Sequence, residues 1–598
     1  MRLKQHKHLF LLTVVLFCSM QTTVAQKKRK IAKHKVQTMG HQKLIIYQLL
    51  PRLFGNSNTQ NIVYGTIAQN GSGKFNDISE KALDGIREMG TTHVWYTGVI
   101  AHASLTDYSA FGIQPDDADV VKGRAGSPYA IRDYYDVDPD LAVNVNKRMA
   151  EFEALVKRTH KKEMKVIIDF VPNHVARRYQ AHAKPVKVID FGAADDVSKA
   201  FAPGNDYYYV PGKALVVPTH PDTITTALSP LQDHHFKEFP AKATGNNVFS
   251  EYPNADDWYE TIKLNYGVDY LDGEKKYFSP MPPVWGKMKD ILMYWADKGV
   301  DGFRCDMAEM VPVEFWNWVI PEIKKAHPEM LFIGEAYNPQ AYETYFNEGK
   351  FDYLYDKVGL YDGLKRLIRN EDHADVYEIT KAWQVERHAF SHKMLRFLEN
   401  HDEERIASAG FAGDAFLALP AMVVSATLSG GPVMLYFGQE VGEPAIGKEG
   451  FGGDDNRSTI FDYWGIPEHQ KWMNKGAFDG ALLSPEQLQL RDFYKRLMQL
   501  TTSSPAIQKG EIFEIPRLGN MNNRMYGYIR YTAGQRLLVV ANFDRHQTME
   551  VEIDIPEHIL NGKDLSKALP LLGATDLSHD AKTITIKLNP VDAQIIEF

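Results

Sequence analysis

The chain has 598 residues, of which 44% are hydrophobic and 24% charged, and its formal net charge is -8. This length predicts about three domains at roughly 100 to 200 residues each, with larger single barrels allowed. The composition is close to the globular average, and the acidic balance argues against a nucleic-acid partner, because such proteins usually present a basic face.

The N-terminus has the three parts of a secretory signal peptide. Three basic residues precede the apolar run LFLLTVVLFCSM, and Thr23 and Ala25 suit cleavage after Ala25. We therefore expect a signal peptide over residues 1–25, a basic tether over 26–40, and a periplasmic or extracellular protein. The apolar run is too short for a comfortable transmembrane helix, and no other stretch reaches spanning length.

The chain has two cysteines, Cys18 and Cys305. Acylation of Cys18 would make a lipoprotein, but Phe17 stands where a small residue is expected, so plain cleavage is favoured. Cleavage leaves Cys305 alone, which excludes an intramolecular disulfide. Because Cys305 stands between Arg304 and Asp306 on a predicted strand, it faces away from both and is expected to be a buried apolar side chain rather than a nucleophile.

Eight short apolar segments with β-rich composition recur along the chain. They lie at 43–49, 93–99, 165–171, 300–306, 331–336, 351–356, 395–401 and 432–440. Helix-like stretches such as 151–162 and 283–299 stand between several of them, and this alternation predicts a parallel sheet. Eight such units closing on themselves give a (β/α)8 TIM barrel. An open doubly wound sheet is the alternative, weakened because no glycine-rich phosphate motif follows the first strand.

Two further domains are predicted from spacing and composition. Residues 176–280, between the third and fourth strands, are rich in Pro, Gly, Asn, Asp and Tyr, which predicts an inserted, loop-rich domain. After a helix-like stretch at 485–500, alternating strands predict a C-terminal antiparallel β-sandwich over 502–598. The barrel itself is assigned to 41–175 and 281–501.

Polar and charged side chains gather at the carboxyl ends of the predicted strands, which form the active-site face of a barrel. They are Asp169, Asn173, His174, Arg304, Asp306, Glu335, His401 and Asp402. Any one of them alone could cap a helix or be a loop side chain that makes only local hydrogen bonds. Agreement across several strands is harder to explain in that way.

The carboxyl groups of this set differ in their sequence surroundings. Arg304 and Asp306 share one face of a strand, so the guanidinium is expected to hold Asp306 ionised as a nucleophile. A purely structural salt bridge is the alternative, but buried pairs are rarely net stabilisers. Glu335 follows LFIG with no cation adjacent in sequence, which favours a protonated general acid. With Asp402 as a third carboxyl, the set has what cleavage of a glycosidic bond requires.

An ordered series of motifs resembles the α-amylase family, glycoside hydrolase family 13, over nearly the whole mature length. In order, the motifs are SPYAIRDYYDVDP (127–139), DFVPNH (169–174), GFRCD (302–306), GEA (334–336), ENHDE (399–403) and GGPVMLYFGQE (430–440). Each motif is weak alone, whereas the ordered set at these strand ends is specific.

The resemblance implies a retaining mechanism and a role for each residue. Asp306 would attack the sugar, Glu335 would act as acid and then as base, and Asp402 would stabilise the distorted sugar and the transition state. Tyr129 would stack on the sugar ring, with a core tyrosine as the alternative. The residues implied to bind around the cleaved bond are Tyr129, Asp169, His174, Arg304 and His401.

The inserted segment would correspond to the family's domain B, where KLN (263–265) resembles a motif of the neopullulanase and cyclomaltodextrinase-like branch. Glu309 and Met310 stand where the family often has a lysine and a histidine that contact the acceptor sugar, so acceptor-side specificity stays open. Asn173 matches a calcium-ligating position, but no other oxygen ligands are recognisable. No cofactor is therefore required, and calcium is allowed.

The resemblance implies an exported retaining α-glucan hydrolase acting on starch-derived, pullulan-type or cyclic maltodextrins through a covalent glycosyl-enzyme. An α-glucanotransferase or branching-type transglycosylase would use the same site with a sugar acceptor. A non-catalytic glycan-binding protein is less favoured, because all three acids are present together with Arg304 and both histidines. The expected partner is an α-glucan, with no membrane span and the oligomeric state left open. The C-terminal domain is expected to cover the barrel rather than bind sugar.

Overall fold

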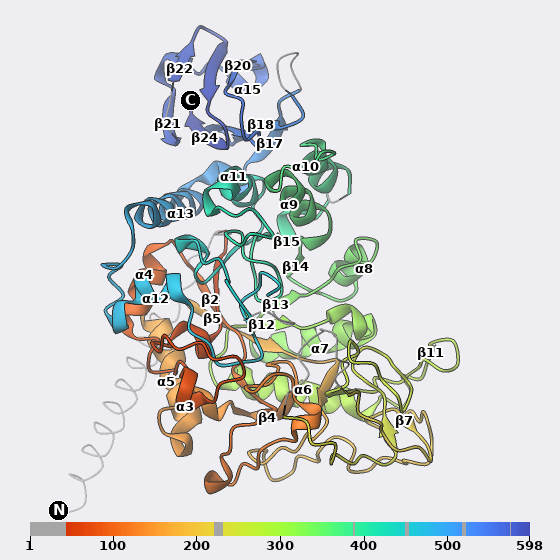
Figure 1. Cartoon of the computed structure of the whole chain (residues 1–598). Coiled ribbons are helices and arrows are strands. Elements are labelled where there is room, and N and C mark those ends of the chain that lie inside the picture. The colour runs from red at the N-terminus through yellow and green to blue at the C-terminus, as the bar shows by residue number, and fades with distance from the viewer. Residues whose placement is uncertain (1–42, 220–230, 387–388, 449–453, 517–521, 574–575) are drawn as a thin grey trace, which may run out of the picture. The chain divides into compact units, whose positions relative to one another are not determined.

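The computed structural model describes residues 43–219, 231–386, 389–448, 454–516, 522–573 and 576–598 (Figure 1). The predicted signal peptide and tether lie outside these ranges. Residues 43–598 form one compact unit. Among the described helices, none combines the length and apolar character that crossing a membrane needs.

A single sheet of eight strands forms the centre of the structure, and its strands are all parallel. A parallel bridge between Arg396 and Val433 joins the two end strands. The (β/α)8 barrel is therefore confirmed, and the open sheet is excluded. In chain order the strands are β1 (Ile45–Leu49), β2 (His93–Tyr96), β5 (Lys165–Phe170), β12 (Gly302–Cys305), β13 (Leu331–Gly334), β14 (Tyr353–Tyr355), β15 (Met394–Leu395) and β16 (Val433–Tyr436).

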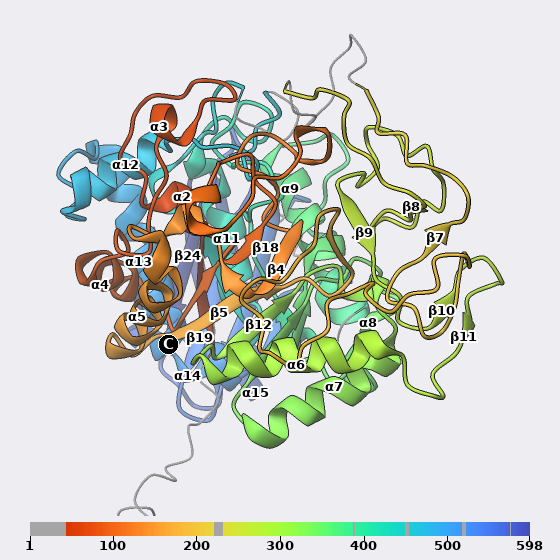
Figure 2. The ribbon, with the colours of Figure 1, turned by 90° about the horizontal axis from the view of Figure 1, so that it is seen from below.

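Helices surround the sheet, and their apolar faces point toward it. All three helix-like stretches expected from the sequence are helical, as α5 (Arg148–Lys161), α6 (Pro283–Asp297) and α13 (Pro485–Ser503). Figure 2 shows α6 running beside α7 (Val313–Ala326), outside the strands. The remaining barrel helices of six or more residues are α4 (Glu80–Glu88), α8 (Tyr342–Asn347), α9 (Asp362–Ile368), α11 (Leu419–Thr427) and α12 (Pro467–Met473).

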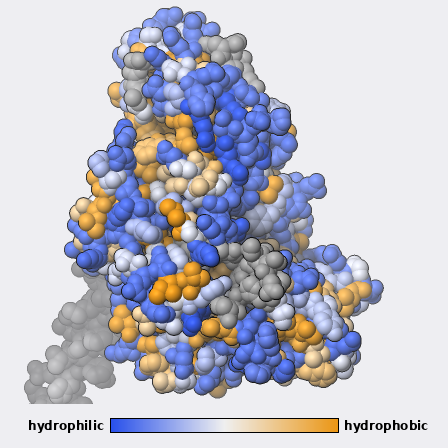
Figure 3. All heavy atoms as spheres, in the orientation of Figure 1, coloured by the Kyte–Doolittle hydropathy of each residue, from blue (hydrophilic) through white to orange (hydrophobic). Residues whose placement is uncertain are grey.

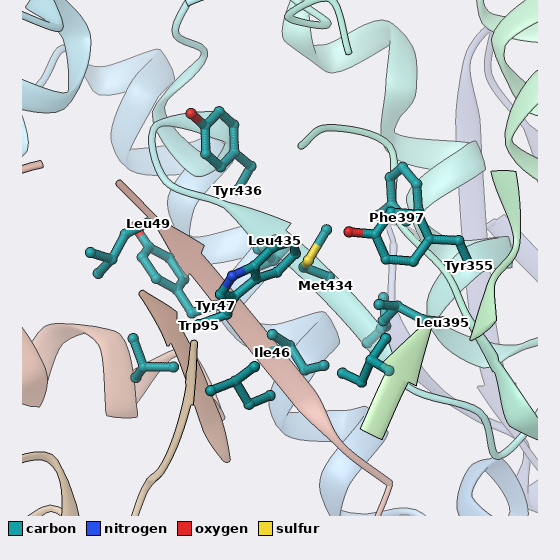
Figure 4. Packing of buried hydrophobic residues seen from close by; sticks show 14 of the residues in the cluster. Ile46, Tyr47, Leu49, Trp95, Tyr355, Leu395, Phe397, Met434, Leu435 and Tyr436 are labelled. Atoms are coloured by element: carbon teal, nitrogen blue, oxygen red, sulfur yellow. The ribbon is translucent and has the colours of Figure 1, made fainter. Parts of the chain in front are cut away.

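The barrel interior is filled by side chains from neighbouring strands (Figure 4). Ile46, Leu395 and Met434 are fully buried there. Each such aliphatic side chain contributes about 1.5 to 3 kcal/mol when it leaves water. Trp95 belongs to the same core, and its indole Nε1 donates a hydrogen bond to Oδ2 of Asp169 at 3.0 Å. Packing at the centre of the barrel therefore orients a carboxylate at its carboxyl end.

The inserted segment leaves the barrel directly after β5. Its described part, residues 176–219 and 231–280, has no helix and only very short strands. β6 (His174–Ala176) pairs antiparallel with β9 (Thr261–Lys263), so that His174 stands opposite Lys263. The other strands of the segment are β7 (Tyr209–Val210), β8 (Ala241–Lys242), β10 (Val268–Asp269) and β11 (Lys275–Lys276). This pairing fixes the inserted segment to the active-site end of the barrel.

The C-terminal part forms two antiparallel sheets. One contains β17 (Glu511–Glu514), β18 (Met525–Tyr531), β19 (Arg536–Asn542), β24 (Asp592–Glu597) and β21 (Leu569–Leu572), and the other β20 (Met549–Asp554), β23 (Thr583–Leu588) and β22 (Asp576–His579). Ile529 and Leu538 of the first sheet share a buried cluster with Val551 and Ile586 of the second. This is the packing of a β-sandwich.

On the face shown in Figure 3, hydrophilic residues predominate and hydrophobic residues form small separate groups. Scattered exposed hydrophobic side chains are usual on globular proteins and mark no binding surface by themselves.

Candidate active site

One buried arginine gathers three carboxyl groups at the carboxyl end of the barrel. Arg304 on β12 is fully buried, and its Nη1 lies 2.8 Å from Oδ1 of Asp306 and 3.4 Å from Oδ1 of Asp169. Its Nη2 lies 2.8 Å from Oε1 of Glu335. Its Nε donates to the hydroxyl of Tyr355 at 3.1 Å. The guanidinium thus joins side chains at the carboxyl ends of β5, β12, β13 and β14.

Strand register explains why these side chains meet. Arg304 is paired with Asp169 across the parallel ladder of β12 and β5. Cys305 is paired with Gly334 of β13, so Asp306 and Glu335 each follow a strand by one residue on adjacent strands. Cys305 itself is fully buried, as expected, and burial raises the pKa of its thiol.

The electrostatic balance at Asp306 differs from the sequence expectation. Burial and the neighbouring Glu335 raise the pKa of Asp306 well above its ordinary value, although Arg304 acts in the opposite direction. Arg304 therefore lowers the pKa of Asp306 as expected, but burial and the charge of Glu335 outweigh this effect, so Arg304 alone does not hold Asp306 ionised. Glu335 has no cation adjacent in sequence, but Arg304 approaches it from another strand.

A second set of contacts connects His401, Asp402 and Tyr129. Nε2 of His401 lies 3.0 Å from Oδ2 of Asp402 and also bonds the hydroxyl of Tyr129. The rings of Tyr129 and His401 stack with centroids 5.3 Å apart, and Tyr129 donates to Oδ1 of Asp169 at 3.3 Å. Burial raises the pKa of Asp402, but His401 and Arg304 outweigh it, so that the pKa is lowered. Asp402 is thus held as a carboxylate.

His174 completes this end of the barrel from β6. Burial lowers its pKa to about 3, with a further contribution from the charge of Lys263, so the imidazole is neutral near pH 7. Its ring lies 5.3 Å, centroid to centroid, from that of Trp258 in the inserted segment. A neutral histidine can still donate one hydrogen bond to a sugar hydroxyl.

The residues around Asn173 do not fit the calcium ion that the resemblance allowed. The ammonium of Lys263 donates to Oδ1 of Asn173 and, at 3.1 Å, to the carbonyl oxygen of Met310. Nδ2 of Asn173 donates to the carbonyl oxygen of Gly245 at 2.8 Å. Lys263 is only 1% exposed, and its Nζ lies 5.4 Å from the ring centroid of Tyr270. The amino group of Lys263, whose pKa burial lowers to about 7, therefore occupies the oxygen ligands that a metal would need.

A separate acidic group, Asp117, Asp119 and Asp233, has carboxylate oxygens within 4.8 Å of one another. Both oxygens of Asp119 already accept backbone N–H groups, from Asp233 and His234 on one oxygen and from Phe236 on the other. These bonds tie two loops together, and we assign no metal to this group.

The structure brings seven of the nine site residues expected from sequence into one network of side-chain contacts. The other two, His174 and Asn173, lie beside each other, with Nδ2 of Asn173 3.1 Å from Nδ1 of His174. Sequence reasoning missed Tyr337, whose hydroxyl donates to Oε1 of Glu335 at 2.6 Å, and also Tyr355 and Trp258. Tyr337 and Glu335 are two positions apart in GEAY, a spacing that could have indicated a shared face. No local signal indicates Trp258.

The arrangement combines nucleophilic and general acid groups. Asp306 and Glu335 contact the same guanidinium, and the raised pKa of Asp306 means that the pair retains a proton toward neutral pH. Two carboxyl groups that share one proton can supply a carboxylate nucleophile and a carboxylic acid at the same bond. Asp169, Asp306 and Glu335 are only 3–6% exposed. Because water screens charges less at buried positions, the interactions between these charges are stronger than at the surface.

Comparisons with known proteins agree with this geometry. The model of the alpha-amylase catalytic domain matches residues 48–466. Alpha-amylase 3 of Dictyoglomus thermophilum is 22% identical over 530 residues, covering 86% of this chain and 87% of that protein. Neopullulanase 2 of Thermoactinomyces vulgaris is 21% identical over 526 residues, covering 86% of this chain and 71% of its own length.

Solved structures share the fold. The alpha-amylase of Geobacillus thermoleovorans complexed with acarbose superposes with a TM-score of 0.58 at 19% identity, covering 93% of this chain and 98% of that one. The native debranching enzyme of Nostoc punctiforme gives a TM-score of 0.59 at 16% identity, with the same coverage. At these identities the likeness concerns the fold alone.

Proposed function

The chain belongs to the alpha-amylase family of glycoside hydrolases, and on this basis we propose that it hydrolyses α-glycosidic bonds with retention of anomeric configuration. The proposed substrates are starch-derived, pullulan-type or cyclic maltodextrins. The observation that carries the proposal is the joint contact of Arg304 with Asp306 and Glu335 in a buried site that Asp402 borders.

Each carboxyl group has a separate task in the proposed reaction. The Asp306 carboxylate attacks the anomeric carbon while Glu335 gives its proton to the leaving oxygen, which leaves a covalent glycosyl-enzyme. Glu335, now ionised, then removes a proton from water, and the hydroxide oxygen displaces Asp306 from the sugar. Asp402, whose pKa is lowered, faces the positive charge that develops on the sugar.

Arg304 supports both halves of this reaction. It stabilises whichever of Asp306 and Glu335 is ionised, because its two Nη atoms contact one carboxyl each. The proton can thus belong to Glu335 before the first step and leave it afterwards without an uncompensated charge in the buried site.

We also propose export through a cleaved signal peptide over residues 1–25, to the periplasm or beyond. The support is the order of basic residues, apolar run and small residues at the cleavage position. The N-terminal sequence of the protein recovered from cell fractions tests this, because a mature chain starting at Gln26 is expected. An intact N-terminus on cytoplasmic material would contradict it.

The activity is tested with starch, pullulan, cyclodextrin and maltooligosaccharides, each followed by product chromatography and by NMR of the first-formed anomer. Shorter products with the α-configuration are expected. Release of the β-anomer would contradict retention, and products longer than the substrate would identify an α-glucanotransferase on the same site.

A further inference from the structure

Glu335 is held by two hydrogen bonds and one ion pair. Oε1 accepts the hydroxyl of Tyr337 at 2.6 Å and lies 2.8 Å from Nη2 of Arg304. Oε2 accepts the backbone N–H of Met307 at 2.7 Å. Met307 has a φ of 42°, a left-handed conformation that is unfavourable for a residue with a side chain, and its N–H points at the carboxyl group.

These partners are not equivalent once Glu335 carries a proton. The guanidinium of Arg304 and the N–H of Met307 can only donate, so neither can receive a hydrogen bond from a carboxylic acid. The hydroxyl of Tyr337 can both donate and accept. A proton on Oε2 would face the Met307 N–H. Oε1 has two neighbours, the guanidinium of Arg304, which cannot accept a hydrogen bond, and the hydroxyl of Tyr337, which can, so a proton on Oε1 can point at the Tyr337 oxygen.

Tyr337 is itself held by Glu309. The two carboxylate oxygens of Glu309 accept the backbone N–H groups of Tyr337 at 2.7 Å and of Asn338 at 2.9 Å. The hydroxyl of Tyr345 donates to the carbonyl oxygen of Glu309 at 3.3 Å. The loop after Glu335 is therefore fixed to the short helical turn that follows the nucleophile.

From these contacts we infer that Tyr337 is a positioning residue that fixes the proton of Glu335 on Oε1, and that Glu309 holds Tyr337 in the place where it can do so. The inference rests on the proposed function, because it assumes that Glu335 is the general acid. The leaving oxygen must approach the atom that carries the proton, so Tyr337 borders the acceptor side of the site. Glu309, which replaces an expected acceptor contact, then acts on the acceptor side through Tyr337.

A comparison of leaving groups tests the inference. Cleavage of maltopentaose needs a proton on a poorly leaving sugar oxygen, whereas fluoride leaves α-maltosyl fluoride with little help from an acid. For Tyr337→Phe, kcat/KM on maltopentaose is expected to fall by about 10-fold or more, and kcat/KM on α-maltosyl fluoride by less than about threefold. Glu309→Ala should give the same pattern. The double variant should lose no more of kcat/KM on maltopentaose than the single variant with the larger loss.

Tyr294→Phe is the matched control, because it removes a hydroxyl that donates at 2.9 Å to the backbone oxygen of Tyr135 on the outside of the barrel. It should leave both rates unchanged. Equal losses on both substrates for Tyr337→Phe, or no loss on maltopentaose, would overturn the inference. A wild-type protein that cleaves neither substrate would instead overturn the proposed function and the inference with it.

Discussion

Arg304 contacts Glu335 as closely as it contacts Asp306, at 2.8 Å in each case. The two carboxyl groups therefore compete for one cation, and a change at any of the three residues alters the protonation of the others.

Asp306→Asn should abolish turnover without unfolding the protein. The amide cannot attack the anomeric carbon, so kcat on maltopentaose is expected to fall by at least about 10³-fold. Because the change removes a buried carboxyl group whose pKa burial has raised, the melting temperature should stay the same or rise. Asp492→Asn, an exposed position on α13, is the control and should keep full activity. Wild-type-like rates for Asp306→Asn would refute the nucleophile assignment.

Arg304→Gln should move the acid limb of the pH profile of kcat/KM to higher pH. Arg304 lowers the pKa of Asp306, so its loss raises that pKa further. The nucleophile is active only when ionised, and a higher pKa therefore demands a higher pH. Melting temperature should fall, since buried carboxyl groups lose their partner. Arg304→Lys should recover part of both effects, and an acid limb that stays in place would contradict the shared-cation interpretation.

Cys305→Ala should leave activity intact. Cys305 is fully buried, and burial raises the pKa of its thiol, so the native protein should resist thiol reagents and become labelled only on unfolding. Loss of the sulfur leaves a small cavity that costs about 1 kcal/mol of unfolding free energy. Rapid labelling of the native mature chain, or an inactive alanine variant, would show that Cys305 has a chemical role.

The barrel could be predicted from the sequence because strands buried on both faces are nearly continuous apolar segments between helices. Each predicted segment overlaps one strand, although β15 shares only Leu395 with the segment expected at 395–401. That strand pairs over just two residues with β14. In the residues that follow, Glu399 accepts the backbone N–H of Ile406, and Nδ1 of His401 lies 2.7 Å from Nε2 of Gln48. Local sequence does not distinguish such a short pairing from a longer strand.

The sequence predicts which site residues lie at the carboxyl ends of strands, but not which of these residues contact one another. Because parallel strands bring their carboxyl ends together, the sequence pattern alone predicts that Asp306 and Glu335 lie on one face of the barrel. The contact of Arg304 with Glu335 depends on the register between β12 and β13, which no local pattern specifies. Likewise, Lys263 is 90 residues from Asn173 in the chain, so the cation that replaces a metal there could not be recognised.

The contact between Lys263 and Asn173 predicts how the protein responds to calcium. Because the ammonium already bonds the oxygens of Asn173 and Met310, neither chelator nor added calcium should change the melting temperature or activity of the wild-type protein. Lys263→Asp puts a shorter carboxylate beside those two oxygens, which leaves room for an ion and supplies a third hard ligand. This variant should melt lower in chelator and recover with calcium, by about 2.7 kcal/mol when the ion is at 100 times its Kd.

Lys276→Asp is the matched control for this experiment, because it makes the same change at an exposed position of β11. Its melting temperature should not respond to calcium. A wild-type protein that melts earlier in chelator would contradict the role of Lys263, since a metal would then stabilise the fold. A Lys263→Asp variant with the same melting temperature in chelator and in calcium would show that no calcium binds there. The oxygens of Asn173 and Met310 would then not form a cation site even with the added carboxylate.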